Sequence, residues 1–154
     1  MDYNTKKHAV YLLTYHMVFV TKYRRPCISE EIGDWMKDYA SRLLENAGGG
    51  LVSAETDRDH IHLLVSLPPD MAPTAAVTML KTMLSKKLHC NQEYMEHVRK
   101  YLYGDVPFWS ASYFVASTGS VSMETVKQYI ESQRTEEHQK RRYVKSGKYK
   151  KGGV

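Results

Sequence analysis

Residues 60–67 read HIHLLVSL, and two prolines follow at positions 68 and 69. The enrichment in aliphatic residues and the prolines that end the run are typical of a β-strand. Side chains two residues apart on a strand lie on the same face. Ile61, Leu63 and Val65 are therefore expected to point into a core, and His60 and His62 to the opposite face. The stretch predicts a sheet with one apolar face and one face that carries two histidines.

Three further strands are expected around this one. Residues 51–56 precede it across the turn Asp57-Arg58-Asp59, so the two strands form a hairpin. Residues 8–21 read HAVYLLTYHMVFVT and residues 108–117 read FWSASYFVAS, and both are rich in the β-branched and aromatic residues that favour strands.

Four helices are expected from the capping side chains and from apolar residues at helical spacing. They are residues 29–47 with Ser29 as the cap, 74–90 with Thr74 as the cap, 94–101, and 122–133 with Ser122 as the cap. The order of elements predicts an α+β fold: a ferredoxin-like split βαβ (RRM-like) antiparallel sheet with helices on one face and an extra C-terminal helix. That fold serves many functions and does not by itself indicate an activity.

The composition is typical of one globular domain: 154 residues, 42% of them hydrophobic and 25% charged. We expect a single domain over residues 1–137 and a basic C-terminal tail over 138–154. No apolar run predicts a signal peptide or a membrane span. Cys27 and Cys90 lie far apart in the sequence, which favours a cytoplasmic protein without a disulfide framework.

The net charge of +5 and the twelve tyrosines permit binding to a nucleic acid. Besides the tail, basic residues gather in two places, and a solvated surface is the alternative interpretation for each. The candidates for contacts with a nucleic-acid backbone are Lys22, Arg24, Arg25, Lys86 and Lys87.

His60 and His62 are candidates for a metal site, because their Cα atoms are expected roughly 7 Å apart on one face. A structural zinc site needs four ligands, often from cysteine pairs, which this sequence does not offer. The histidines therefore favour an open site with room for a substrate oxygen. Two polar residues on an exposed sheet face are the alternative. His16 receives no role. Asp59 is interpreted as a turn residue, and a hydrogen-bond partner for a histidine is the alternative.

Tyr129 and Gln133 lie four residues apart and share one face of the last predicted helix. A tyrosine phenolate can attack phosphorus and form a covalent ester. The carbonyl oxygen of Gln133 can complete a metal site. A chance pair on a helix surface is the alternative interpretation of this spacing.

Four stretches together resemble one family. They are 59–65 (DHIHLLV), 15–26 (YHMVFVTKYRRP), 109–119 (WSASYFVASTG) and 126–133 (VKQYIESQ). In this order they are similar to the motifs of the small single-tyrosine insertion-sequence transposases, which belong to the His-hydrophobe-His (HUH) superfamily of single-strand DNA nucleases. The resemblance covers most of residues 8–134.

The resemblance implies a mechanism. His60 and His62 would bind one Mg²⁺ or Mn²⁺ ion with Gln133 as a third ligand, and Tyr129 would hold the cleaved strand by its 5′ phosphate. The freed 3′ hydroxyl would later rejoin strands. Such enzymes recognise DNA hairpins near the ends of insertion sequences, in single-stranded form. They are homodimers in which the helix of one subunit can complete the site of the other.

Two other functions remain open from the sequence. A domesticated relative would perform the same chemistry on palindromic repeats of a chromosome. A non-catalytic module that binds RNA or single-stranded DNA would need aromatic residues on the central strands for base stacking. The strand at 60–67 carries histidines and aliphatic residues instead, which argues against the second function.

Overall fold

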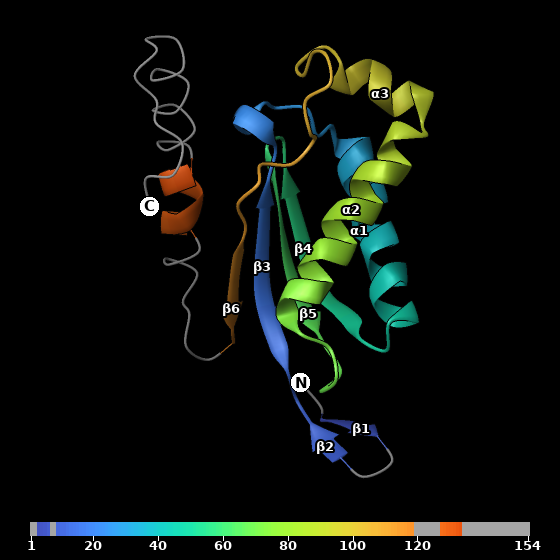
Figure 1. The fold of residues 1–154 in the computed structure, drawn as a ribbon, viewed down its shortest axis with the longest axis vertical. Coiled ribbons are helices and arrows are strands. Elements are labelled where there is room, and N and C mark those ends of the chain that lie inside the picture. The colour runs from blue at the N-terminus through green and yellow to red at the C-terminus, as the bar shows by residue number, and fades with distance from the viewer. Residues whose placement is uncertain (1–2, 7–8, 119–126, 134–154) are drawn as a thin grey trace.

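The computed structural model describes residues 3–6, 9–118 and 127–133. Its centre is a four-stranded antiparallel sheet in the order β4-β5-β3-β6 (Figure 1). The strands are β3 (Thr14–Val20), β4 (Gly50–Asp57), β5 (His60–Ser66) and β6 (Phe114–Ser117). This order is that of a split βαβ sheet, which confirms the predicted fold class.

Two long helices, α1 (Glu30–Asn46) and α2 (Pro73–His89), cover one face of the sheet (Figure 1). The shorter α3 (Gln92–Val98) follows α2. Apolar side chains from the sheet and the helices form the main core between them. Its fully buried members include Met17, Phe19, Ile61, Leu63, Val65, Ile32, Met36, Leu44, Leu80, Leu84 and Leu88. The period-two pattern of β5 thus predicted the covered face correctly.

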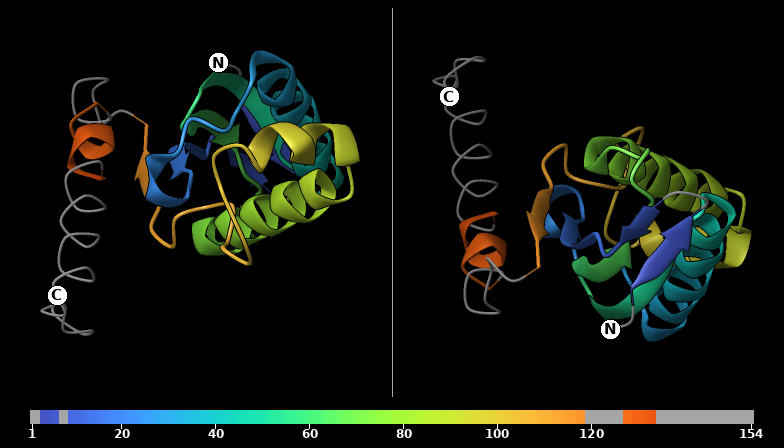
Figure 2. Two further views of the ribbon diagram at one scale, coloured as in Figure 1. Left: turned by 90° about the horizontal axis from the view of Figure 1, so that it is seen from above. Right: turned by 90° about the horizontal axis from the view of Figure 1, so that it is seen from below.

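The opposite face of the sheet carries a helical segment over residues 127–133. Both views in Figure 2 show this segment and the α1–α2 layer on opposite sides of the sheet. It packs against Val18 and Val20 of β3 through Tyr129 and Ile130, with Phe114 alongside. The predicted extra helix is therefore present where the structure describes it, although Ser122 and the tail 138–154 lie outside the described residues.

The predicted strand over 8–21 is wrong in one respect, because the structure divides it. Residues Ala9–Tyr11 form β2, which pairs with β1 (Asn4–Lys6) in a separate two-stranded ribbon. The ladder between β3 and β5 ends where Thr14 meets Ser66, just before Pro68 and Pro69. Because β5 ends there, the residues before Thr14 pair with β1 instead.

The predicted start of the second helix also needs correction. Helix α2 begins at Pro73, and its N-cap is Ala72 rather than Thr74. Proline suits the first helical position because its φ is already helical and its missing N–H is not needed there. Ser29 does cap α1, since its side chain accepts a hydrogen bond from the Ile32 amide.

The third helix and the last strand are shorter or displaced. Asn91 caps α3 by accepting a hydrogen bond from the Tyr94 amide, so the helix begins before the predicted residue 94. Strand β6 comprises only the end of the predicted 108–117. Trp109 makes an isolated bridge to Thr21, and Phe108 and Trp109 are buried in the core, which draws this part of the chain out of the ladder.

Within the described residues, no helix is both long enough and apolar enough to cross a membrane.

Candidate active site

The two histidines of β5 lie together on the face opposite α1 and α2. Burial alternates along the strand: Ile61 and Leu63 are fully buried, whereas His60 and His62 are half-buried. On the neighbouring β3, His60 pairs with Val20 and His62 with Val18. These valines belong to the second apolar cluster, under the helical segment 127–133. The shared face predicted from the sequence is thus present.

His60 is oriented by Asp59, which the sequence reasoning treated as a turn residue. The Asp59 Oδ1 atom lies 2.9 Å from His60 Nδ1, and Oδ2 lies 2.6 Å from the Nη2 atom of Arg24. Burial opposes the ionisation of Asp59, but the hydrogen bonds from His60 and Arg24 and the charge of Arg24 outweigh it, so its pKa lies below the ordinary value. An ionised Asp59 accepts a hydrogen bond from the Nδ1–H group of His60, which leaves Nε2 as the nitrogen that could bind a metal ion.

His62 contacts a third histidine. Its Nε2 atom lies 3.0 Å from Nδ1 of His16, and the ring centroids are 5.2 Å apart. Burial lowers the pKa of His62, and the neighbouring His16 lowers it further, while Glu55 has the opposite effect. A neutral imidazole is the form that binds metals. Sequence reasoning missed His16 because it lies 46 residues away and meets His62 only through the strand register.

Two acidic residues of β4 lie across from the histidines. Asp57 pairs with His60 and Glu55 with His62 in the β4–β5 ladder. Ligand atoms of Asp57, Asp59 and His60 lie within 4.8 Å of one another, in a geometry that could hold a cation. Negative charge on this edge favours a divalent ion near the histidines.

Tyr129 and Gln133 both contact the β6 side of the sheet. The Tyr129 ring lies 5.0 Å from the Phe114 ring, centroid to centroid, and its hydroxyl oxygen is buried. The Gln133 side chain is 7% exposed, and its Oε1 atom accepts a hydrogen bond from the Ser112 hydroxyl. The two residues share one helix face, as their spacing predicted.

The other face of the segment looks toward His60. Lys127, Ile130 and Glu131 line a cavity of about 450 Å³ together with residues from the end of the sheet. Those residues are Arg24, Pro26, Asp57, Arg58, Asp59 and His60. Positions 127 and 131 lie on the side of a helix opposite 129 and 133. The segment therefore presents Lys127 and Ile130, rather than Tyr129, toward the His60 cavity of its own chain.

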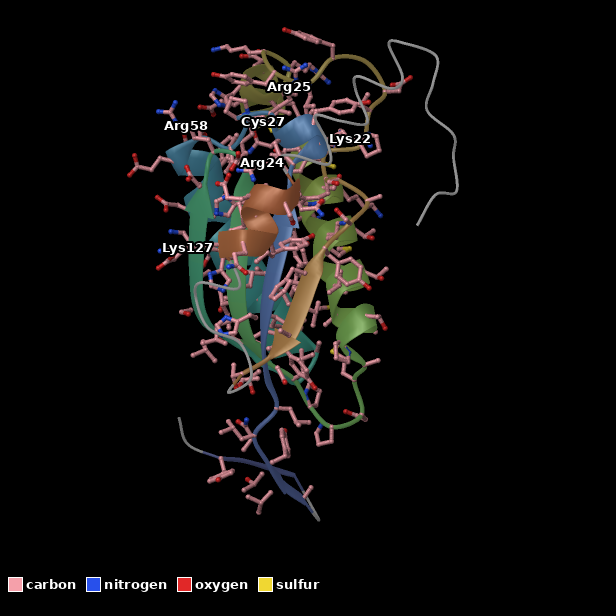
Figure 3. The ribbon with its side chains drawn as sticks, turned by 90° about the vertical axis from the view of Figure 1, so that its left-hand side faces the viewer. Lys22, Arg24, Arg25, Cys27, Arg58 and Lys127 are labelled. Carbon is pink, nitrogen blue, oxygen red and sulfur yellow. The ribbon has the colours of Figure 1, made fainter. Side chains whose placement is uncertain are left out.

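The predicted DNA-contacting residues fall into two groups. Lys22, Arg24 and Arg25 lie in and beside the 3-10 turn η1 (Lys22–Arg24), near the upper end of the sheet in Figure 3. Arg24 is engaged inside the protein, since its side chain is 7% exposed. Lys86 and Lys87 are exposed on α2, in the helix layer on the far side of the sheet from His60.

Lys81 of α2 supports the loop before β6 instead of adding to the exposed basic surface. Its Nζ atom donates to the Ser110 carbonyl at 2.7 Å and lies 3.4 Å from the Ser112 carbonyl. Burial lowers its pKa. This loop carries the hydroxyl that holds Gln133, so α2 helps to place Gln133 from the other side of the sheet.

Side chains on this face could hold a single divalent ion. His60 and His62 offer imidazole nitrogens on one face, and the His60 ring is fixed by a carboxylate in the way that metal-binding histidines usually are. Gln133 is the predicted third ligand, and its Oε1 atom is bonded to Ser112. Coordination by Gln133 therefore requires it to exchange the Ser112 hydroxyl for the ion.

Comparison with known proteins gives a consistent result. Residues 9–133 match the family model described as transposase, IS200 like. The ISDra2 transposase TnpA of Deinococcus radiodurans is 29% identical over 128 residues, which cover 83% of this chain and 89% of the relative. The transposase for insertion sequence element IS200 of Salmonella typhimurium is 28% identical over 136 residues, covering 88% and 86%.

A solved structure is similar as well. The crystal structure of a candidate transposase from Deinococcus radiodurans superimposes with a TM-score of 0.72 and 26% sequence identity, and the match covers 84% of this chain and 97% of that one. The similarity thus extends over nearly the whole of the described fold.

Proposed function

Because the chain belongs to the IS200-like transposase family, we propose that it cleaves and rejoins single-stranded DNA with Tyr129 as the nucleophile and with one divalent ion held by His60 and His62. Members of this family are single-strand DNA endonucleases and strand transferases, and this chain is a transposase that acts on DNA. The observation that carries the proposed site is the packing of the Tyr129 segment on the sheet face that bears both histidines.

The chemistry follows from the groups on this face. The phenol oxygen of Tyr129 attacks the phosphorus, an O–P bond forms, the P–O3′ bond breaks, and the phenolic proton ends on the freed 3′ hydroxyl. The product is a 5′-phosphotyrosine, and attack by a 3′ hydroxyl on that ester reverses the step and joins strands. No energy source is needed, because each step exchanges one phosphoester for another.

His60 and His62 would bind the ion, Mg²⁺ or Mn²⁺, with Gln133 as a third ligand. An ion bound there polarises a phosphate oxygen and offsets the negative charge that develops during attack. Asp59 holds the His60 ring in place, and the segment packs against Val18 and Val20 beside the histidines.

We infer that the active form is a homodimer in which subunits can share sites. Tyr129 and Gln133 contact Phe114 and Ser112 at the β6 side, whereas the opposite face of their segment lines the His60 cavity. To attack at His60 of its own chain, the segment would have to turn. A segment from a second subunit could instead enter with Tyr129 foremost.

A mixing experiment separates these two routes. Neither Tyr129→Phe nor His62→Ala alone should cleave DNA. If sites are shared, mixed and exchanged subunits contain one intact site, so cleavage returns. If each chain uses its own tyrosine, a confirmed mixed dimer stays inactive. A protein that is monomeric at all working concentrations contradicts the homodimer itself.

The DNA substrate is proposed to be single-stranded, with a hairpin near the cleavage point, from an insertion-sequence end. Basic side chains position a phosphate backbone but do not specify sequence. Lys22 and Arg25 beside the site are the candidates best placed to do this, while Lys86 and Lys87 lie on the helix layer. Replacing the hairpin stem by unpaired sequence should reduce binding at an unchanged cleavage site.

The decisive assay is formation of a denaturant-stable protein–DNA adduct with single strands from both flanks of the gene, in Mg²⁺ or Mn²⁺. We expect an adduct with one strand, and none with duplex DNA, with EDTA, with Tyr129→Phe or with His62→Ala. Cleavage of chromosomal palindromic repeats instead of the flanks would support the domesticated role. Hairpin binding that survives Tyr129→Phe, without an adduct on any DNA, would indicate a non-catalytic binding module.

A further inference from the structure

Arg24 makes the most extensive contacts of the basic residues near the site. Its Nε and Nη2 atoms donate to Asp59 Oδ2 at 3.0 and 2.6 Å. Its Nη1 atom donates to the backbone carbonyl of Ile130 in the helical segment 127–133. One guanidinium therefore bonds both the residue before the first histidine and the segment that carries Tyr129.

The contact continues to His60 through the second oxygen of the same carboxylate. The Oδ2 atom of Asp59 accepts hydrogen bonds from Arg24, and its Oδ1 atom accepts one from Nδ1 of His60. The side chains of Arg24 and Asp59 are 7% and 15% exposed, so water screens their ion pair little. An unbroken chain of hydrogen bonds thus runs from the Ile130 carbonyl to the His60 ring.

The backbone at this position is unusual in a way that supports a specific role. Tyr23 and Arg24 have φ values of 57° and 50°, in the left-handed region that non-glycine residues rarely adopt. Two consecutive residues in this conformation persist only where the surrounding contacts hold them. Here the conformation accompanies a guanidinium directed inward, whereas Arg58 beside the same cavity is exposed. Figure 3 shows the positions of both arginines relative to the segment.

We propose that Arg24 is a positioning residue that couples the orientation of His60 to the docking of the helical segment 127–133. Docking of the segment supplies the Ile130 carbonyl to Nη1 and so fixes the guanidinium, which in turn fixes Asp59 and the His60 ring. Coupling of this kind is reciprocal. Metal binding at His60 should therefore stabilise the docked segment, and docking should strengthen metal binding.

This role differs from a contact with a DNA phosphate, which was the prediction for Arg24 from the sequence. Three donor atoms of its guanidinium are already bonded inside the protein. Lysine cannot reproduce the arrangement, because one ammonium group cannot span Asp59 and Ile130 with the fixed geometry of a guanidinium. Phosphate binding alone would tolerate lysine much better.

The inference rests on the proposed metal site, and its test uses Mn²⁺ with the full-length protein and no DNA. Mn²⁺ affinity is measured by calorimetry, and amide hydrogen exchange of residues 127–133 is measured with and without Mn²⁺. In the wild type, we expect Mn²⁺ to slow exchange in the segment. In Arg24→Gln, exchange should be faster without metal, Mn²⁺ should no longer slow it, and Mn²⁺ should bind roughly 10-fold more weakly.

Arg58→Gln is the matched control, since it removes the same charge from an exposed residue of the same cavity. It should behave as the wild type does in both measurements. Arg24→Lys should resemble Arg24→Gln rather than the wild type, and it replaces Arg24→Gln if that variant does not fold. Asp59→Asn should weaken Mn²⁺ binding similarly, and the double variant should lose little more, because both changes break one chain of contacts.

The outcomes separate the inference from the proposed function. A folded Arg24→Gln variant with wild-type Mn²⁺ affinity and a wild-type response of the segment would overturn the coupling. A wild type that binds no Mn²⁺ would contradict the metal site itself. In that case, equal exchange of 127–133 in wild type and Arg24→Gln would also show that Arg24 does not hold the segment.

Discussion

The two faces of β5 are built from alternate residues of one strand, yet they depend on different parts of the chain. On the covered face, Ile61, Leu63 and Val65 are fully buried against α1 and α2. The opposite face, which carries the segment 127–133 and not the two long helices, is called the open face. On it, His60 and His62 contact polar side chains from the turn before the strand and from β3. Under the proposed function, one face contributes mainly to stability and the other mainly to chemistry, so substitutions should separate the two.

The largest expected effect is a loss of strand cleavage when Tyr129 on the open face is replaced. Tyr129→Phe removes only a hydroxyl group and keeps the ring against Phe114. We expect the rate of strand cleavage to fall by a factor on the order of 10⁴ or more, as for loss of other enzymatic nucleophiles. The free energy of unfolding in urea should change by less than about 1 kcal/mol. Comparable losses of activity and stability would mean that the segment is structural rather than catalytic.

A substitution on the covered face should instead lower stability and leave metal binding nearly unchanged. Leu63→Ala creates a cavity under α1 and α2 and is expected to lower the free energy of unfolding by about 2–5 kcal/mol. Below the unfolding transition, the folded protein should keep its Mn²⁺ affinity within a few-fold. Urea unfolding and calorimetry measure the two quantities. His62→Ala, one residue away on the other face, is the comparison, and a Leu63→Ala variant as stable as the wild type would contradict the division.

A smaller effect, on Mn²⁺ affinity, is expected from Ser112 in the loop before β6. Ser112 donates to the Oε1 atom of Gln133 that is the predicted metal ligand. Ser112→Ala removes this competing bond, which is worth about 1 kcal/mol, so Mn²⁺ should bind up to about 5-fold more tightly. Ser53→Ala, at an exposed position of β4, is the control. Weaker binding in Ser112→Ala would indicate that the serine positions Gln133 for the ion.

The smallest expected effect is on the stability of the protein at acidic pH. The pKa of Asp59 is lowered in the folded protein, so its ionised form stabilises the fold above the unfolded value of about 3.9. This stabilisation is lost as the pH falls through the lower, folded pKa. The advantage of the wild type over Asp59→Asn in urea unfolding should therefore be constant above about pH 5 and shrink below pH 4. An advantage that grows on acidification would contradict the lowered pKa.

The two faces also differ in how far the sequence predicted them. The covered face followed from local rules: alternation along β5, helical spacing in α1 and the Ser29 cap. The alternation also placed His60 and His62 together. Their more distant partners could not be found this way, because His16 meets His62 only through the register of β3 on β5, and Arg24 reaches His60 only through Asp59. Asp59 was adjacent in sequence, but nothing local distinguishes a turn aspartate from one that holds a histidine.

The errors in the fold have a similar origin. Residues 8–21 have strand propensity throughout, and the break before Thr14 arises because β5 ends at Ser66. Residues 108–113 also have strand propensity. Burial of Phe108 and Trp109 in the core nevertheless keeps residues 108–113 out of β6. In both places the available partner, rather than the local sequence, decides where a strand ends.

The central claim is that the open face carries the reaction through Tyr129, and peptide mapping of the protein–DNA adduct tests it most directly. Trypsin cleaves after Lys127 and Arg134, so Tyr129 lies in the peptide 128–134, in which it is the sole tyrosine. After nuclease and trypsin digestion, mass spectrometry should find the nucleotide phosphate on this peptide. Its attachment to a different peptide, such as those carrying Tyr23 or Tyr113, would contradict the account.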